Sequence, residues 1–84
     1  MSRKHAKTIA RIFENPAPAN IKWADIERAV VGLGVEVTEG SGSRVRFAFN
    51  GVRSVLHRPH PSPTATRPQV RSVRTFLKNA GVKP

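Results

Sequence analysis

The side chains best suited to moving a proton in this chain of 84 residues are two histidines in a proline-rich stretch, His57 and His60. An imidazole accepts or donates a proton near neutral pH, so the pair could serve as base and acid in phosphodiester cleavage. They could also bind a metal ion, but two histidines with no third ligand nearby indicate a metal site only weakly. A structural role in the loop is equally open for each of them. His5, in a basic N-terminal segment, is expected on the surface.

The charge of the chain indicates a polyanionic partner. Lys and Arg number 15 against 5 Asp and Glu, which gives a net charge of +10. Residues 41–84 contain nine of the cations and no acidic residue, so we expect neither paired-carboxylate catalysis nor an Asp/Glu metal cage there, and no cofactor. Such a charge favours nucleic acid as the partner, with an acidic membrane surface second. A merely solvated basic face is the simpler alternative.

A two-residue turn at Asn50-Gly51 predicts a hairpin and sets its pairing. This dipeptide favours a type I′ turn, because both of its residues tolerate a positive φ. Alternation over residues 43–49 and 52–57 places apolar side chains on one face, which we expect to be the core face. The other face gathers a basic cluster of Arg44, Arg46, Arg53 and His57. In this cluster Arg44 lies opposite His57.

Like charges so close together on one sheet repel one another unless a counterion lies among them. A phosphate backbone supplies such a counterion, since the guanidinium fork binds phosphate oxygens in pairs. The alternative is an ordinary exposed strand face that carries arginine without a ligand.

A second basic surface is expected on the last helix. Thr66 can cap this helix, and Pro68 fits its first turn. Its apolar face repeats at helical spacing over residues 70–80. The opposite face has no Glu and carries cations at i, i+4, i+7 and i+11, which are Arg67, Arg71, Arg74 and Lys78. We interpret this face as a surface that follows a phosphate backbone. The alternative is a solvated helix face.

Hydrophobic periodicity predicts an α+β domain. Helices are expected over residues 4–13, 23–33 and 66–80, and strands over 35–38, 43–49 and 52–57. A three-stranded antiparallel sheet with helices packed on one face accommodates this order. The prolines at 16 and 18 divide the chain into an N-terminal helical extension with its linker, residues 1–20, and a domain of residues 21–84.

Composition excludes several classes of protein. The chain has no cysteine, so a disulfide scaffold, a thiolate zinc site and a cysteine nucleophile are ruled out. The longest nearly apolar stretch, residues 29–35, is too short to cross a bilayer, and the basic N-terminus lacks the apolar core of a signal peptide. We therefore expect a cytoplasmic protein without a membrane partner.

The order and spacing of several short motifs resemble the HicA family, small toxins of bacterial toxin–antitoxin pairs. The motifs are Trp23-Ala24-Asp25-Ile26-Glu27, Gly40-Ser41-Gly42-Ser43-Arg44-Val45, Gly51-Val52-Arg53-Ser54-Val55, Pro59-His60-Pro61 and a closing segment over residues 70–82. The resemblance covers about residues 21–83. It implies a fold like the double-stranded-RNA-binding domain, α-β-β-β-α, here preceded by an extra helix. It also implies cleavage of messenger RNA and neutralisation by a HicB-like antitoxin.

One residue departs from the family's pattern. The family's catalytic histidine stands at the start of the second strand, directly after the Gly/Ser turn, where this chain has Arg44. Arginine stays protonated and cannot act as a base, but it could bind the scissile phosphate and stabilise its developing charge. His57 then becomes the candidate base of a metal-independent endoribonuclease, and His60 the weaker candidate.

Two other interpretations stay open, a module that binds RNA without cutting it and a small basic DNA-binding protein. Nothing in the sequence resembles a recognition helix with base-reading Asn or Gln, which weakens the DNA interpretation. The residues expected to bind RNA come from the hairpin face, the following loop and the last helix: Arg44, Arg46, Arg53, Arg58, Arg67, Arg71, Arg74 and Lys78.

Overall fold

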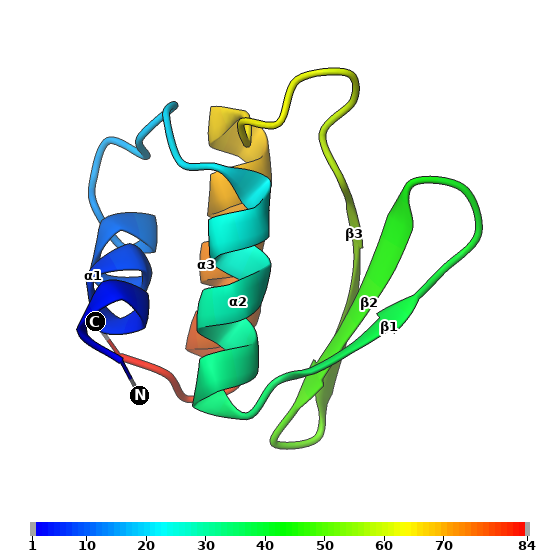
Figure 1. Cartoon of the computed structure of the whole chain (residues 1–84). Helices are drawn as coiled ribbons and strands as arrows, with labels where there is room; N and C mark the ends of the chain where they lie inside the picture. The colour runs from blue at the N-terminus through cyan, green and yellow to red at the C-terminus, as the bar shows by residue number, and fades with distance from the viewer. Residues whose placement is uncertain (1, 84) are drawn as a thin grey trace.

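Figure 1 shows the computed structural model of the protein, which describes residues 2–83. The strands form one antiparallel sheet in the order β1-β2-β3, and the helices lie on one side of it (Figure 1). This architecture confirms the predicted α+β class. The elements follow one another as α1 (Arg3–Ile12), α2 (Trp23–Leu33), β1 (Glu36–Glu39), β2 (Arg44–Phe49), β3 (Val52–His57) and α3 (Arg67–Asn79).

The helix ends follow local capping chemistry. The Ser2 hydroxyl accepts a hydrogen bond from the His5 amide at 3.1 Å and begins α1. Gly34 ends α2 in the left-handed region, with φ of 107°. Thr66 caps α3 as predicted, and Gln69 completes a reciprocal capping box that the sequence reading did not include.

The hairpin of β2 and β3 has the predicted turn and the predicted register. Asn50 and Gly51 both have positive φ, 50° and 79°. The cross-strand pairs run from Phe49 with Val52 to Arg44 with His57. β1 adds to the other side of β2, through a four-residue connection at 40–43.

The core lies between the sheet and the helices and is built around Phe47. Its ring stacks on Trp23, with centroids 6.3 Å apart, and meets Phe76 edge to face at 5.6 Å. The core face predicted for the hairpin is confirmed, since Val45, Phe47 and Leu56 are all buried. Burial of these apolar side chains is the main source of stability in so small a domain.

Helix α1 lies on the far side of α2 and α3 from the sheet, and both ends of the chain lie beside it (Figure 1). Its side chains Ile9 and Ile12 are buried in the same core as the sheet and the other helices. The N-terminal extension is therefore packed against the rest of the fold. No helix within residues 2–83 is long and apolar enough to cross a membrane.

Candidate nucleic-acid interface

The outer face of the hairpin carries the predicted cluster of Arg44, Arg46, Arg53 and His57, called the sheet-face cluster below. All four side chains are exposed. The register places Arg44 beside His57 and Arg46 beside Val55, a residue that is 57% exposed. No carboxylate of residues 2–83 forms a salt bridge with any of the three arginines. The cluster thus presents unneutralised charge in a flat, accessible setting.

Strand β1 adds one acidic residue to this face, which the sequence analysis did not place there. Glu36 pairs with Ala48, and Thr38 pairs with Arg46. These residues border a shallow hollow of about 500 Å³ on the outer face, which Arg53 also lines. Glu36 lies at the turn end of β2, whereas Arg44 and His57 lie at the opposite end. The end that holds the candidate base therefore has the stronger positive charge.

His57 is held through its backbone and not through its ring. The amide Nε2 of Gln69 donates to the His57 carbonyl at 3.1 Å, which ties the end of β3 to the first turn of α3. Within residues 2–83 the imidazole makes no hydrogen bond, so both ring nitrogens are free to meet a ligand. Gln69 is a positioning residue that sequence reasoning missed, and only its place in the capping box could have drawn attention to it.

Arg58 does not share the exposed setting of the sheet-face cluster. Its guanidinium donates to the Glu27 carboxylate at 2.7 and 3.1 Å and to the Glu39 carboxylate at 2.6 and 2.7 Å. The hydrogen bonds from Arg58 hold the pKa of Glu39 below its ordinary value, and those to Glu39 and Glu27 raise the pKa of Arg58. Trp23 also donates its indole N–H to Glu27. Arg58 thus links α2 and β1 to the end of β3, and its charge is already partnered.

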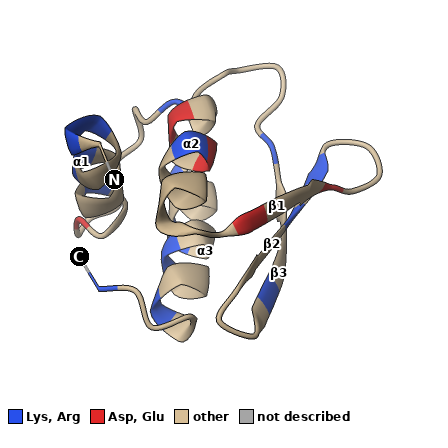
Figure 2. Ribbon diagram, turned by 60° about the horizontal axis from the view of Figure 1, so that its bottom comes forward, with Lys and Arg blue, Asp and Glu red and all other residues tan. Residues whose placement is uncertain are grey.

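The cationic stripe of α3 divides into two pairs. Arg67 donates to the carbonyl of Ala17 at 3.2 Å, and Arg74 donates to the carbonyl of Ile12 at 2.9 Å. Both therefore hold the N-terminal segment against α3. The side chains of Arg71 and Lys78 are exposed and form no hydrogen bond or salt bridge within residues 2–83. Figure 2 shows the resulting distribution, with basic residues on α1, on α3 and along the strands, and acidic residues on α2 and β1.

His60 lies exposed in the loop between β3 and α3, outside the paired strands. No group of three or more metal-ligating side chains comes together within residues 2–83. Of the predicted catalytic residues, the fold brings together Arg44, with an exposed guanidinium, and His57, with a free imidazole.

The sequence comparison matches most of the chain to one family. The family model described as "HicA toxin of bacterial toxin-antitoxin" matches residues 23–82. The match begins at the first residue of α2 and includes α3, so α1 lies outside it. No curated protein and no solved structure matches the chain.

Proposed function

This chain belongs to the HicA family of bacterial toxin–antitoxin toxins, and from that premise we propose that it binds and cleaves messenger RNA through its sheet-face cluster. The single observation that carries the proposal is the pairing of Arg44 with His57 on the exposed face, next to Arg46. A guanidinium binds phosphate oxygens, and a neighbouring imidazole can take a proton from a hydroxyl. Membership of the family also implies an antitoxin partner.

Phosphate binding by this face follows from its charge. Arg44 and Arg53 have no partner within the described chain, and Arg46 donates only to the backbone carbonyl of Glu39, at 3.2 Å. Their repulsion is relieved when the phosphates of a polyanion lie among them, and the cations condensed on that polyanion are released to solution. RNA is favoured over duplex DNA because A-form RNA is recognised through shape and phosphates, which suits a flat arginine face.

The proposed reaction is an internal transfer at phosphorus. His57 accepts the proton of a ribose 2′-hydroxyl, and the 2′-oxygen attacks the adjacent phosphorus. The bond to the 5′-oxygen breaks, which leaves a 2′,3′-cyclic phosphate and a 5′-hydroxyl that takes its proton from water. Arg44 stabilises the charge that develops on the phosphoryl oxygens, a form of electrostatic catalysis.

A second candidate function is RNA binding without cleavage. It is favoured by one observation, which is that Arg44 stands where the resemblance predicts the family's catalytic histidine. If His57 does not replace that histidine, the same face binds RNA and does not turn it over.

A cleavage assay in the presence of chelator separates the two functions. Wild type, His57→Ala, His60→Ala and Arg44→His are incubated with labelled RNA. General-base catalysis contributes about 10²–10⁴-fold, so His57→Ala should lose most of the rate while it still binds RNA. His60→Ala is the matched control, because it removes an imidazole from the neighbouring loop, and it should stay close to wild type.

Each remaining outcome assigns the site differently. Full activity in His57→Ala removes His57 from the reaction. Tight RNA binding without any cleavage by wild type establishes the non-catalytic function. A marked gain of activity in Arg44→His identifies the natural protein as an attenuated nuclease.

For the antitoxin, we propose a HicB-like acidic protein that covers the sheet-face cluster and competes with RNA. The charge of residues 41–84 supports this, since complementary charge speeds encounter and selects partners. Such masking explains how a cell tolerates its own toxin.

A further inference from the structure

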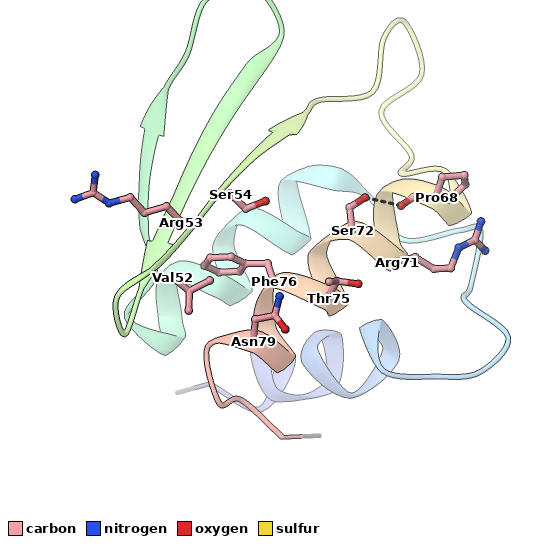
Figure 3. A pocket seen from close by; sticks show the side chains of 9 residues that line it. All are labelled: Val52, Arg53, Ser54, Pro68, Arg71, Ser72, Thr75, Phe76 and Asn79. Atoms are coloured by element: carbon pink, nitrogen blue, oxygen red, sulfur yellow. Dashed lines mark hydrogen bonds between the residues drawn. The ribbon is translucent and has the colours of Figure 1, made fainter.

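A groove follows the outer edge of the sheet between β3 and α3, next to the sheet-face cluster at Arg53. It consists of two adjoining hollows, of about 400 and 150 Å³, which share Pro68 and Ser72 of α3. Figure 3 shows the larger hollow, with β3 on one side and α3 on the other. Ser54 lies on the core side of β3 but has a small side chain, so α3 and the sheet do not close on each other at this point.

The edge of β3 that borders this groove has unpaired backbone groups. In an antiparallel pair, residues whose N–H and C=O face the partner alternate with residues whose groups face away. The two-residue turn makes Phe49 and Val52 a hydrogen-bonded pair, so Arg53, Val55 and His57 direct their groups outward. The bond from Gln69 to the His57 carbonyl agrees with this assignment. Within residues 2–83 the backbone groups of Arg53 and Val55 have no partner.

This pattern selects among the classes of ligand that could lie in the groove. N–H and C=O groups that alternate along an edge complement another peptide strand, whereas a phosphate backbone offers acceptors only. Arg53 projects from the outer face of β3 beside this edge, away from α3 (Figure 3), and favours acidic side chains on the outer face of that strand. The floor of the groove around Val52 and Phe76 accepts small apolar side chains. A second copy of this chain is disfavoured, because it would bring another net charge of +10 to the same edge.

We propose that the groove between β3 and α3 binds an extended acidic segment of the antitoxin, which adds to the sheet as a fourth strand beside β3. The segment pairs with the outward groups of Arg53 and Val55, places apolar side chains toward Phe76 and places carboxylates on the outer face near Arg53. The inference depends on the proposed function only in assigning this segment to the antitoxin.

The test uses a capped, fluorescein-labelled hexapeptide of alternating Glu and Val, with capped hexaglutamate as the control for charge alone. Val55→Pro removes one outward N–H and leaves the pairing with β2 intact, because proline is tolerated at an edge that faces solvent. Val55→Ala is its matched control, since it shortens the side chain and keeps the N–H. Ser72→Trp fills the groove from an exposed position of α3, outside the sheet-face cluster. Circular dichroism verifies that each variant is folded.

Fluorescence anisotropy should show that the Glu/Val peptide binds wild type and Val55→Ala within about threefold of each other. Val55→Pro and Ser72→Trp should each lose at least tenfold, about 1.4 kcal/mol, while their affinity for RNA is unchanged. The proposal is overturned if wild type does not bind the Glu/Val peptide or binds hexaglutamate equally well. It is also overturned if Val55→Pro and Ser72→Trp both bind the Glu/Val peptide as tightly as wild type does. Loss of RNA binding in these variants, in place of peptide binding, also contradicts it. So does a homodimer of wild type that Val55→Pro abolishes, because a second copy of the chain would then occupy the edge of β3. Failure of wild type to bind RNA contradicts the proposed function and leaves the peptide result intact.

Discussion

The sharpest test of the sheet-face cluster is the salt dependence of RNA binding after two of its arginines are removed. Arg44→Ala combined with Arg46→Ala takes two positive charges from the outer face of β2. Both side chains are exposed and point away from the core, so each change should alter the free energy of unfolding by only about 0.5 kcal/mol. A matched control removes two charges from α1 with Arg3→Ala and Lys7→Ala, which are also exposed and belong to the helix on the far side of α2 and α3 from the sheet (Figure 1).

The expected magnitude follows from the number of arginines on the face. For single strands, each phosphate contact adds about 0.7 to the slope of log affinity against log salt, so three arginines give a slope near −2. Wild type should then lose about 20-fold in affinity between about 50 and about 200 mM salt. The double variant keeps only Arg53 on this face, so its affinity should fall by only about threefold over the same range.

The assay is fluorescence anisotropy with a labelled single-stranded RNA at several salt concentrations, together with thermal unfolding of each variant. The α1 control should keep the slope of wild type. A slope that falls equally in both double variants would show that RNA responds to the total charge and not to the sheet-face cluster. A large loss of melting temperature in Arg44→Ala/Arg46→Ala would contradict the assignment of this face to solvent.

Three further outcomes are expected. Phe47→Ala should destabilise the fold by roughly 3–5 kcal/mol and Leu77→Ala by roughly 2–5 kcal/mol, because both side chains are fully buried. Denaturant unfolding measures both effects, and unchanged unfolding midpoints would contradict the core described above. Arg58 lowers the pKa of the Glu39 carboxyl from its ordinary value of 4.5. The stability that the ionised carboxylate contributes is therefore complete above pH 4.5 and is lost as the pH falls through the lowered pKa. In Glu39→Gln, stability should therefore fall less than in wild type over that acidic range, and identical pH profiles would show that the link to Arg58 contributes nothing. The antitoxin should co-purify with the protein and displace RNA from it, which a stable complex of all three would disprove.

The hairpin could be predicted in full because its determinants are local. Asn50-Gly51 specifies the turn, and the turn specifies every cross-strand pair back to Arg44 and His57. The position of β1 could not be derived in the same way. Its four-residue connection does not set a register, so the alternation around Glu36 indicated a strand but not its neighbours.

The partners of the other arginines could not be predicted from the sequence, because the partner residues are distant along the chain. Arg58 follows the hairpin and resembles one more phosphate ligand, yet Glu27 and Glu39, 31 and 19 residues away, converge on it. Arg74 has the helical spacing of a solvated stripe, but its guanidinium meets a carbonyl of α1, 62 residues away. Periodicity predicts which face of an element is polar. It does not predict which other element comes to cover that face.

The few acidic residues of the chain leave the sheet-face cluster without an internal counterion. Glu27 and Glu39 are both bound to Arg58, and Asp25 contacts Arg28 and Lys4 on the helical side. Of the remaining two, Glu36 lies at the turn end of the face, away from the pair of Arg44 and His57, and Glu14 lies just after α1. The charge at the end with Arg44 and His57 is thus left without an internal partner, whereas the edge of β3 lacks partners for its backbone. These are two different deficits, and they fit two different ligands: phosphates on the face and a peptide strand along the edge.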